Sequence, residues 1–516
     1  MQTPTLALIV KREKEIENFT SEPFFEVKAE FQVEDKKYKG VWHKDGETRI
    51  KEEQMAKKIA QFCLHKEALV YELKKERKVY KPPLLFNLSS LQATANKRYK
   101  FPPKKTLDLL QKLYQKGIVS YPRSDSHYVT EGEAAEFPSI LQKISQFNTY
   151  ESLFPVPEPN IIKNKRFVNE KKVSDHYAII PTEQVIDPKH LSSDEEKIYD
   201  LVVRRLIAAH YNAQIVDYTT IETLVDKRAT FVSKGKQQIE VGWKRVIMPN
   251  EKDKDELLPN VTKGEKGSVL EVHVKQGKTE PPKRYTEGQL ITLMKTAGKF
   301  IDNEELEKVL MKSEGLGTEA TRANIITMLK ERKYINVQKN QVYATDKAKV
   351  LIEAIGGKIL SSPEMTAKWE QRLLEISVGQ ASPQVFMEQA KKLATKIVKD
   401  AKEQATSWDF KGLHVEGKNG RKKKTVTKLG NCPRCKRGQI IDKGKFFGCT
   451  DYQKTKCTFT LSKTILSKRI TQTQVKKICQ TMSTDWIKGF KKGEKTFDAK
   501  LVWNQETEKI EFTFKS

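Results

Sequence analysis

The sequence predicts a multidomain protein of the mixed α+β class. Its 516 residues correspond to about three domains of ~150 residues each. Segments that alternate apolar and polar residues, as strands do, occur beside segments with the periodicity of helices. The composition changes near residue 405, where glycine, lysine and clustered cysteines replace long helical patterns. We therefore expect a body of several domains followed by a distinct C-terminal module.

Two helices have clear boundaries in the sequence. Segment 106–116 places three leucines and Tyr114 on one face, and Gly117 is a suitable residue to end the helix. Thr286 and Gln289 have the spacing of a capping box, which marks the start of a second helix. We expect further helices at 6–15, 367–376 and 385–398, and strands at 24–42 and 217–246.

The chain is strongly basic. Its 95 Lys+Arg against 67 Asp+Glu give a formal net charge of +28. Residues 401–516 alone carry 27 basic and 11 acidic side chains, an excess of +16. This distribution indicates a polyanionic partner, most often nucleic acid, although basic charge can also serve solubility alone. Residues 490–514 combine lysines with strand-like alternation, so we expect an accessory DNA-binding lobe there.

The cysteine content and hydropathy indicate the compartment. Six cysteines in 516 residues argue against a disulfide scaffold and for a reducing environment. No apolar run approaches the roughly 20 residues that span a bilayer. We therefore expect a cytoplasmic protein, a monomer that does not enter a membrane.

The segment 117–126, Gly-Ile-Val-Ser-Tyr-Pro-Arg-Ser-Asp-Ser, holds the most informative pattern. Tyr121 precedes a proline, which favours an extended conformation, and in an extended chain residues two apart project to the same side. Arg123 is therefore expected beside the Tyr121 hydroxyl. A phenol is a weak nucleophile unless a cation stabilises its anion, and the same guanidinium can hold a phosphate. A lone Tyr-Pro-Arg is, however, more often a turn with a packed tyrosine.

Two further segments carry side chains suited to phosphate. His176 precedes a short buried strand, and a protonated histidine suits a phosphate oxygen. A Gly-x-Gly turn at 315–317 leads into a helix whose first turn carries Thr318, Thr321 and Arg322, and helix N-termini bind anions. Each signal alone is weak, because a lone histidine is more often structural and Thr318 also suits a simple N-cap. The chain has neither a Walker A nor a His-Glu-x-x-His motif.

Four C-terminal cysteines have the pattern of a metal site. The first pair has the two-residue spacing of a zinc knuckle, and the second pair is more widely spaced. Four thiolates suit tetrahedral Zn²⁺, although a ribbon held by aromatic residues without metal is the alternative. The predicted ligands are Cys432, Cys435, Cys449 and Cys457.

Seven segments, in matching order and spacing, make the chain resemble the type IA DNA topoisomerases, most closely bacterial topoisomerase III. The resemblance covers nearly all of residues 1–400. Its segments are 2–8 (QTPTLAL), 82–96, 117–126, 174–182, 281–287 (PPKRYTE), 315–322 (GLGTEATR) and 366–370 (TAKWE).

The resemblance implies a role for each candidate residue. Tyr121 would form a 5′-phosphotyrosine bond with one DNA strand, Arg123 would stabilise the scissile phosphate, and His176 would support the same site. The reaction would need no ATP, and its substrates would be single-stranded and negatively supercoiled DNA. The DNA-binding side chains implied are Gln2, Thr3, Arg284, Thr318, Thr321 and Arg322.

The resemblance also implies the architecture, a type IA torus with a zinc-ribbon-like C-terminal module. The domains would be a helical one at 1–22 and 279–405, a β-rich arch at 23–81 and 213–278, a winged-helix-like domain with the active-site tyrosine at 82–212, and a basic C-terminal region at 406–516 with the four-Cys ribbon at about 430–465.

The sequence departs from the family in one respect. Type IA enzymes begin with a Toprim domain that supplies a catalytic glutamate, an Asp-x-Asp Mg²⁺ site and a lysine. We expect this domain to be missing, so that the Mg²⁺ site lies in a separate Toprim-containing fragment or in lost sequence. The one Asp-x-Asp here, Asp253-Lys254-Asp255, lies in a charged segment and is a poor metal candidate. The alternatives are a catalytically inactive single-strand-binding remnant and a zinc-ribbon nucleic-acid adaptor.

Overall fold

The computed structural model describes residues 1–248, 255–301, 303–355, 360–405, 408, 427–444, 446–493 and 495–515. The chain forms two compact units, Met1–Val415 and Glu416–Ser516. None of the described helices combines the length and hydropathy that a membrane crossing requires.

Six strands of the first unit close into a barrel in the order β1-β2-β5-β4-β3-β6. Alternate residues of β1 are buried, as the alternating sequence predicts, and Phe31 and Phe231 meet edge to face with ring centroids 5.4 Å apart inside the barrel. Helix α2 (Glu53–Cys63) packs on β1 and β6. The strands are β1 (Pro23–Val33), β2 (Lys36–Trp42), β3 (Glu67–Tyr80), β4 (Gln214–Val225), β5 (Ala229–Glu240) and β6 (Lys266–Lys278).

The expected strand segment 217–246 is correct only in part. It forms most of β4 and all of β5, but its end belongs to a helical turn, α7 (Lys244–Ile247). Val246 and Ile247 of this turn join the core of the neighbouring helical part of the chain. The apolar residues at this end of the segment therefore serve a different core from that of the barrel.

Residues 82–212, which we call the tyrosine region, have one continuous apolar core. Gly117 follows helix α4 with a φ of +76°, a value that favours glycine, and so ends the helix as predicted. Tyr114 corrects the sequence-based assignment, because its side chain is exposed while the leucines of α4 are buried. The helices are α3 (Leu88–Tyr99), α4 (Pro103–Gln115), α5 (Glu131–Ser145), η1 (Glu151–Leu153), η2 (Glu170–Lys172), η3 (Pro188–His190) and α6 (Ser193–Ala209).

Residues 1–22 and 279–405, which we call the helical region, have a core of their own, which joins α1 to helices about 290 residues later in the chain. Thr286 and Gln289 form the predicted capping box of α8. The elements are α1 (Gln2–Glu17), α8 (Glu287–Lys295), η4 (Ala297–Phe300), α9 (Glu304–Lys312), α10 (Glu319–Glu331), β7 (Ile335–Gln338), β8 (Gln341–Ala344), α11 (Asp346–Ile355), α12 (Pro363–Ser377) and α13 (Pro383–Gln404).

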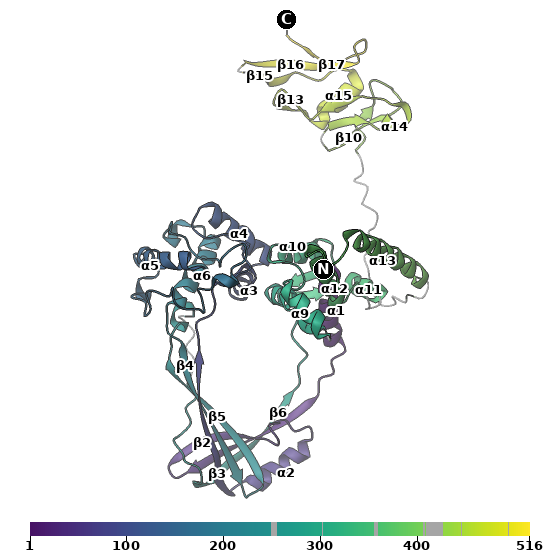
Figure 1. Ribbon diagram of the computed structural model, residues 1–516. Helices are drawn as coiled ribbons and strands as arrows, with labels where there is room; N and C mark the ends of the chain where they lie inside the picture. Colours follow the sequence, from purple (N-terminus) through teal and green to yellow (C-terminus); the bar gives the residue numbers. More distant parts are fainter. Residues whose placement is uncertain are drawn as a thin grey trace. The chain divides into compact units, whose positions relative to one another are not determined.

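The first unit is a closed circuit. The chain runs from α1 through the barrel into the tyrosine region, then back through the barrel into the rest of the helical region. Contacts of α3 and α4 with α8 and α10 join the two helical parts directly, and we call this contact the seam. Figure 1 shows the barrel standing apart from both parts, connected to each by extended chain segments.

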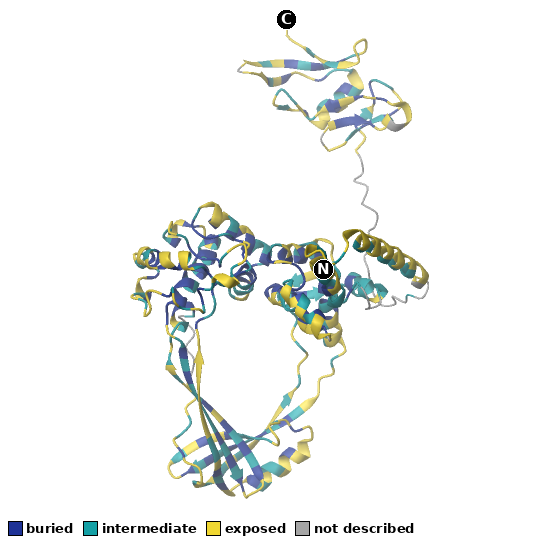
Figure 2. Ribbon diagram, in the orientation of Figure 1, coloured by how far each residue is buried: buried dark blue, intermediate teal, exposed yellow. Residues whose placement is uncertain are grey.

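The second unit has a small core shared by two sheets and helix α15. Figure 2 shows its buried residues along the sheets and α15, with exposed residues in the connecting loops. The elements are β9 (Gly430–Asn431), β10 (Gln439–Asp442), β11 (Phe446–Cys449), α14 (Tyr452–Thr455), β12 (Thr460–Ser462), β13 (Thr464–Ile465), β14 (Lys468–Arg469), α15 (Gln472–Thr481), β15 (Ile487–Lys492), β16 (Lys495–Asn504) and β17 (Lys509–Thr513).

Candidate functional site

Tyr121 lies half-buried between two aromatic rings. The His176 ring packs on it with centroids 4.1 Å apart and an interplanar angle of 32°. The Tyr114 ring, from the last turn of α4, meets it edge-on at 5.7 Å. Tyr114 therefore packs on Tyr121 outside the apolar core and is not buried with the leucines of α4. The structure also brings the two predicted residues Tyr121 and His176 together.

Buried serines join the segments that carry Tyr121 and His176. The Ser120 amide donates to the Ile180 carbonyl at 2.9 Å, and its hydroxyl donates to the Ala178 carbonyl at 2.9 Å. The Ser124 hydroxyl donates to the His176 carbonyl at 3.1 Å. Because Ser120 and Ser124 flank Tyr121, these bonds fix the backbone on both sides of the phenol.

Arg123 does not follow the extended geometry that we expected. Pro122 and Arg123 form a turn, so the alternation that would align Arg123 with Tyr121 is absent. The Arg123 side chain is exposed, and among the described residues it has no hydrogen bond or ion pair. The extended backbone on which that expectation depended is therefore absent, and the exposed Arg123 guanidinium is accessible from solvent.

The predicted DNA-binding residues differ in accessibility. Thr318 and Thr321 are exposed and cap α10 reciprocally. Gln2 accepts a hydrogen bond from Arg332 at 2.9 Å, and Thr3 is half-buried beside it. Arg284 is held by the Glu13 carboxylate at 2.5 Å. Arg322 is fully buried in the seam, so in this conformation its guanidinium does not face solvent.

A buried carboxylate organises the seam. Glu319, in the first turn of α10, accepts hydrogen bonds from the Ser89 amide at 2.6 Å and from the Asn87 side chain at 3.2 Å. It also pairs with Arg322 at 3.0 Å and with Lys295 at 3.1 Å. Glu319 and Asn87 were not predicted from the sequence. The available signal was their position, because they lie in segments 315–322 and 82–96, which both carry the resemblance to one family.

Two titratable side chains beside the seam have shifted pKa values. Burial lowers the pKa of His127, whose Nδ1 lies 2.7 Å from the Leu85 carbonyl oxygen. Burial raises the pKa of the Glu314 carboxyl, although the nearby Arg322 charge opposes that shift. Both shifts disfavour the charged form, as is usual where packed regions exclude water.

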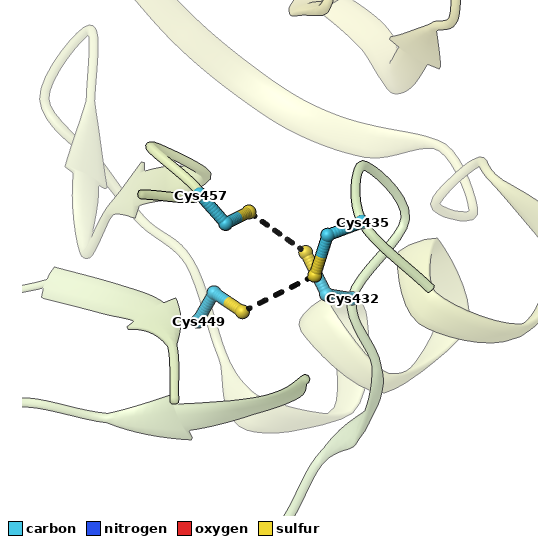
Figure 3. A group of neighbouring side chains, drawn as sticks. All are labelled: Cys432, Cys435, Cys449 and Cys457. Carbon is cyan, nitrogen blue, oxygen red and sulfur yellow. Dashed lines mark hydrogen bonds between the residues drawn. The ribbon is translucent and has the colours of Figure 1, made fainter. Parts of the chain in front are cut away.

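The four C-terminal cysteines converge. Their sulfur atoms all lie within 4.8 Å of one another, and Figure 3 shows the four side chains pointing toward a common centre. The Cys432–Cys457 and Cys435–Cys449 sulfurs are 3.7 and 3.6 Å apart. Tetrahedral Zn²⁺ with Zn–S bonds of about 2.3 Å requires sulfurs about 3.8 Å apart, so the four thiols fit this ion.

Backbone amides support the sulfurs. Gly438 and Asp451 donate N–H groups to Cys435 and Cys449 at 3.4 and 3.3 Å. Burial acts to raise the pKa of Cys435, but the amides of Gly438 and Arg437 outweigh it and lower the pKa to about 7. Cys63 and Cys479 are free thiols whose pKa burial raises to about 11. Among the cysteines that the structure describes, these four are the ones that converge as metal ligands can.

The described residues contain no second group of three or more converging metal ligands. Asp255 accepts the Gln238 amide at 2.8 Å, as a surface carboxylate does, and Asp253 lies outside the described residues. The carboxylates near the seam do not converge either. The part of the chain that the structure describes does not fit a Mg²⁺ site.

A solved structure shares this fold. Full-length topoisomerase I from Thermotoga maritima aligns with 91% of this chain and 70% of its own, with a TM-score of 0.55 at 21% sequence identity. At this identity the likeness concerns the fold alone.

Sequence relatives define the family. The DNA topoisomerase model matches residues 1–388, and a model for the C-terminal repeat of topoisomerase matches residues 456–515. DNA topoisomerase 1 of Alkalihalophilus pseudofirmus is 38% identical over 99% of this chain and 71% of that protein. The chain belongs to the type IA DNA topoisomerase family.

The relatives carry two names. DNA topoisomerase 3 of Bacillus licheniformis and of Bacillus subtilis are 34% and 33% identical over 87% of this chain. The chain spans 66% of the length of each, slightly less than two thirds. The topoisomerase 1 relative has a higher identity than these two topoisomerase 3 relatives. The comparisons therefore do not confirm the expected closer likeness to topoisomerase III. The C-terminal repeat model covers residues 490–514, the segment in which we expected an accessory DNA-binding lobe.

Proposed function

We propose that this chain performs the strand-cleavage half-reactions of a type IA DNA topoisomerase, without ATP, on single-stranded and negatively supercoiled DNA. The observation that carries the proposal is Tyr121, half-buried against the His176 ring inside the segment that matches the family. The net charge of +28 suits a DNA ligand.

The reaction exchanges one phosphodiester for another. The Tyr121 phenol oxygen attacks a backbone phosphorus, a P–O tyrosyl bond forms, and the P–O3′ bond breaks. The phenol loses its proton, and the leaving 3′ oxygen gains one. The phosphotyrosyl ester conserves the free energy of the broken phosphodiester bond. Religation is therefore the direct reverse of cleavage and needs no energy-supplying cofactor. His176 packs on the phenol ring and would present its imidazole to the same phosphate.

The contact between the tyrosine region and the helical region suits a temporary opening that would admit DNA. The tyrosine region and the helical region have separate apolar cores, and they meet at the polar seam. A contact made by hydrogen bonds and ion pairs exchanges them for water when it opens, so separation costs less than dividing an apolar core. Strand passage through the ring would use this contact.

The two expected metals have separate sites. The four cysteines would hold Zn²⁺ as a structural crosslink of the C-terminal ribbon. We propose that Mg²⁺ and an acid–base carboxylate come from a Toprim domain outside this sequence, covalently joined or in a separate fragment. The family's topoisomerase III branch is our proposed subtype.

The test is a plasmid relaxation gel on the 516-residue chain with and without a purified Toprim fragment. We expect the chain alone to bind single-stranded DNA and leave negatively supercoiled plasmid unchanged in Mg²⁺. Addition of the fragment should produce relaxation without ATP, and Tyr121→Phe should abolish it together with the covalent adduct.

The controls separate the alternatives. Binding without relaxation in both mixtures would favour a single-strand-binding remnant. Relaxation by the isolated chain would show that Toprim is dispensable. An adduct in the Tyr121→Phe variant would mean that another residue is the nucleophile.

A further inference from the structure

We propose that Glu319 is a positioning residue that couples closure of the seam to the order of the Tyr121 segment. The inference rests on the proposed function for the role of Tyr121. Its structural basis is a continuous series of hydrogen bonds from the helical region to the His176 backbone.

The first step crosses the seam. Glu319 lies in α10, whereas Asn87 and Ser89 lie at the start of α3. The carboxylate receives the Ser89 amide at 2.6 Å and the Asn87 side-chain amide at 3.2 Å. Arg322 donates to the Ser89 hydroxyl at 2.9 Å. Glu319 therefore completes the cap of α3 only while the two regions touch.

The second step runs from α3 to the Tyr121 segment. Asn87 donates to the Asp125 carbonyl at 3.0 Å, and the Leu88 amide donates to the Ser124 carbonyl at 3.0 Å. The Ser124 hydroxyl in turn donates to the His176 carbonyl at 3.1 Å and accepts the Ser126 amide at 3.2 Å. Asn87 and Ser124 are fully buried, so these bonds do not compete with water.

The charges make the series conditional. Glu319 and Arg322 are almost completely buried, and Lys295 supplies a second cation. A buried ion pair is tolerated when its hydrogen-bonding groups are satisfied, and removing one member leaves the other charge without compensation. When the seam opens, the Glu319 carboxylate becomes hydrated. The Ser89 amide and the Asn87 side chain at the start of α3 then lose their acceptor. The Tyr121 segment is then less constrained, and it is ordered again on closure.

Amide hydrogen exchange on the full chain tests this inference without any activity. Glu319→Gln keeps the shape of the side chain but places an amide group among four donors. We expect exchange at the Leu88 and Ser126 amides to become at least tenfold faster, while helix α5 is unchanged. Glu13→Gln is the matched control, because this buried carboxylate pairs with Arg284 at 2.5 Å inside the helical region and belongs to α1, which is not part of the seam.

A second variant opens the seam elsewhere. A β-carbon at Gly288 would lie 2.9 Å from Asn96 atoms, so Gly288→Val wedges α8 from α3 without altering Glu319. It should accelerate exchange at Ser126 similarly, and the double variant should add little, since both act through closure. Faster exchange confined to Ser89 and α10, with Ser126 unchanged in both variants, would overturn the inference.

The activity arm keeps the two proposals apart. With a Toprim fragment present, Glu319→Gln should slow adduct formation on a single-stranded oligonucleotide about tenfold, with unchanged affinity for the uncleaved strand. Equal adduct rates would overturn the positioning role. If even the unaltered chain forms no adduct, the proposed function fails, and the exchange experiment still decides whether Glu319 orders the segment.

Discussion

The Tyr121 segment and the four-cysteine ribbon hold their reactive side chains in opposite ways. Tyr121 is not a member of the large apolar core of its region, and its segment is fixed by buried serines. Cys432, Cys449 and Cys457 are themselves members of the core of their unit. In the tyrosine region the chemistry and the stability are therefore carried by different residues, whereas in the ribbon they are carried by the same ones.

The difference follows from size. The tyrosine region buries enough apolar surface to fold around a polar loop, and buried serines fix that loop. The second unit has short strands, several of only two residues, and a much smaller core. Small domains commonly depend on a metal or another crosslink for stability. The comparison leads to three predictions about stability.

The largest effect is expected at the ribbon. Cys432→Ser or removal of zinc with a strong chelator should unfold the second unit, since structural zinc contributes about 10 kcal/mol or more in small domains. Differential scanning calorimetry should show loss of one transition and retention of that of the first unit. Cys479→Ser, which alters a thiol outside the cluster, is the control. An unchanged second transition after complete chelation would show that the aromatic core holds the ribbon alone.

The second effect is a pH dependence inside the tyrosine region. His210 is fully buried, its Nδ1–H donates to the Glu158 carbonyl at 2.7 Å, and its Nε2 has no hydrogen-bond partner among the described residues. Burial lowers its pKa to about 4. The unfolded chain binds a proton near pH 6.5 while the folded chain resists it. Stability should therefore fall as the pH drops from about 6.5 to 4, by about 3 kcal/mol.

Urea unfolding of the first unit between pH 7.5 and 4 measures this effect. His210→Gln should flatten the profile, whereas a substitution of the exposed His190 should leave it unchanged. The same acid-dependent slope in the His210→Gln variant would assign the loss to another group.

The smallest effect is expected at the candidate nucleophile. Tyr121→Phe removes one hydroxyl from a half-buried ring that keeps its contacts with His176 and Tyr114. Its free energy of unfolding should change by less than about 0.5 kcal/mol, while adduct formation is abolished. A large destabilisation would contradict the separation of chemistry from stability in the tyrosine region, because it would show that the phenol oxygen stabilises the fold.

Local sequence patterns predicted the elements well. The strands in 24–42, the capping box at Thr286 and the end of α4 at Gly117 all depend on neighbouring residues, and the structure has them. Tyr114 shows the limit, because helical spacing placed it with the leucines although its partner Tyr121 is brought near only by the turn after α4.

Long-range polar contacts were beyond the sequence. Glu319 and Ser89 are 230 positions apart, and nothing in either local pattern indicates that one caps the helix of the other. Arg322 was expected to face a DNA phosphate for the same reason: a helix N-terminus looks open until the opposing region is known. The four cysteines were predictable because all four ligands are of one kind and the first pair has the spacing of a zinc knuckle.

The order of strands in the barrel has a consequence for synthesis on the ribosome. Strand β3 pairs only with β4 and β6, and residues 81–213 separate it from β4. At 5–20 residues per second, β3 waits on the order of ten seconds with unpaired edges while the tyrosine region emerges and can fold. The residues that share an apolar core with helix α1 are synthesised later still, because the first of them is Leu290. The barrel and the core around α1 can therefore be completed only after the tyrosine region has been synthesised, and until then β3 and α1 expose surfaces that are buried in the folded chain.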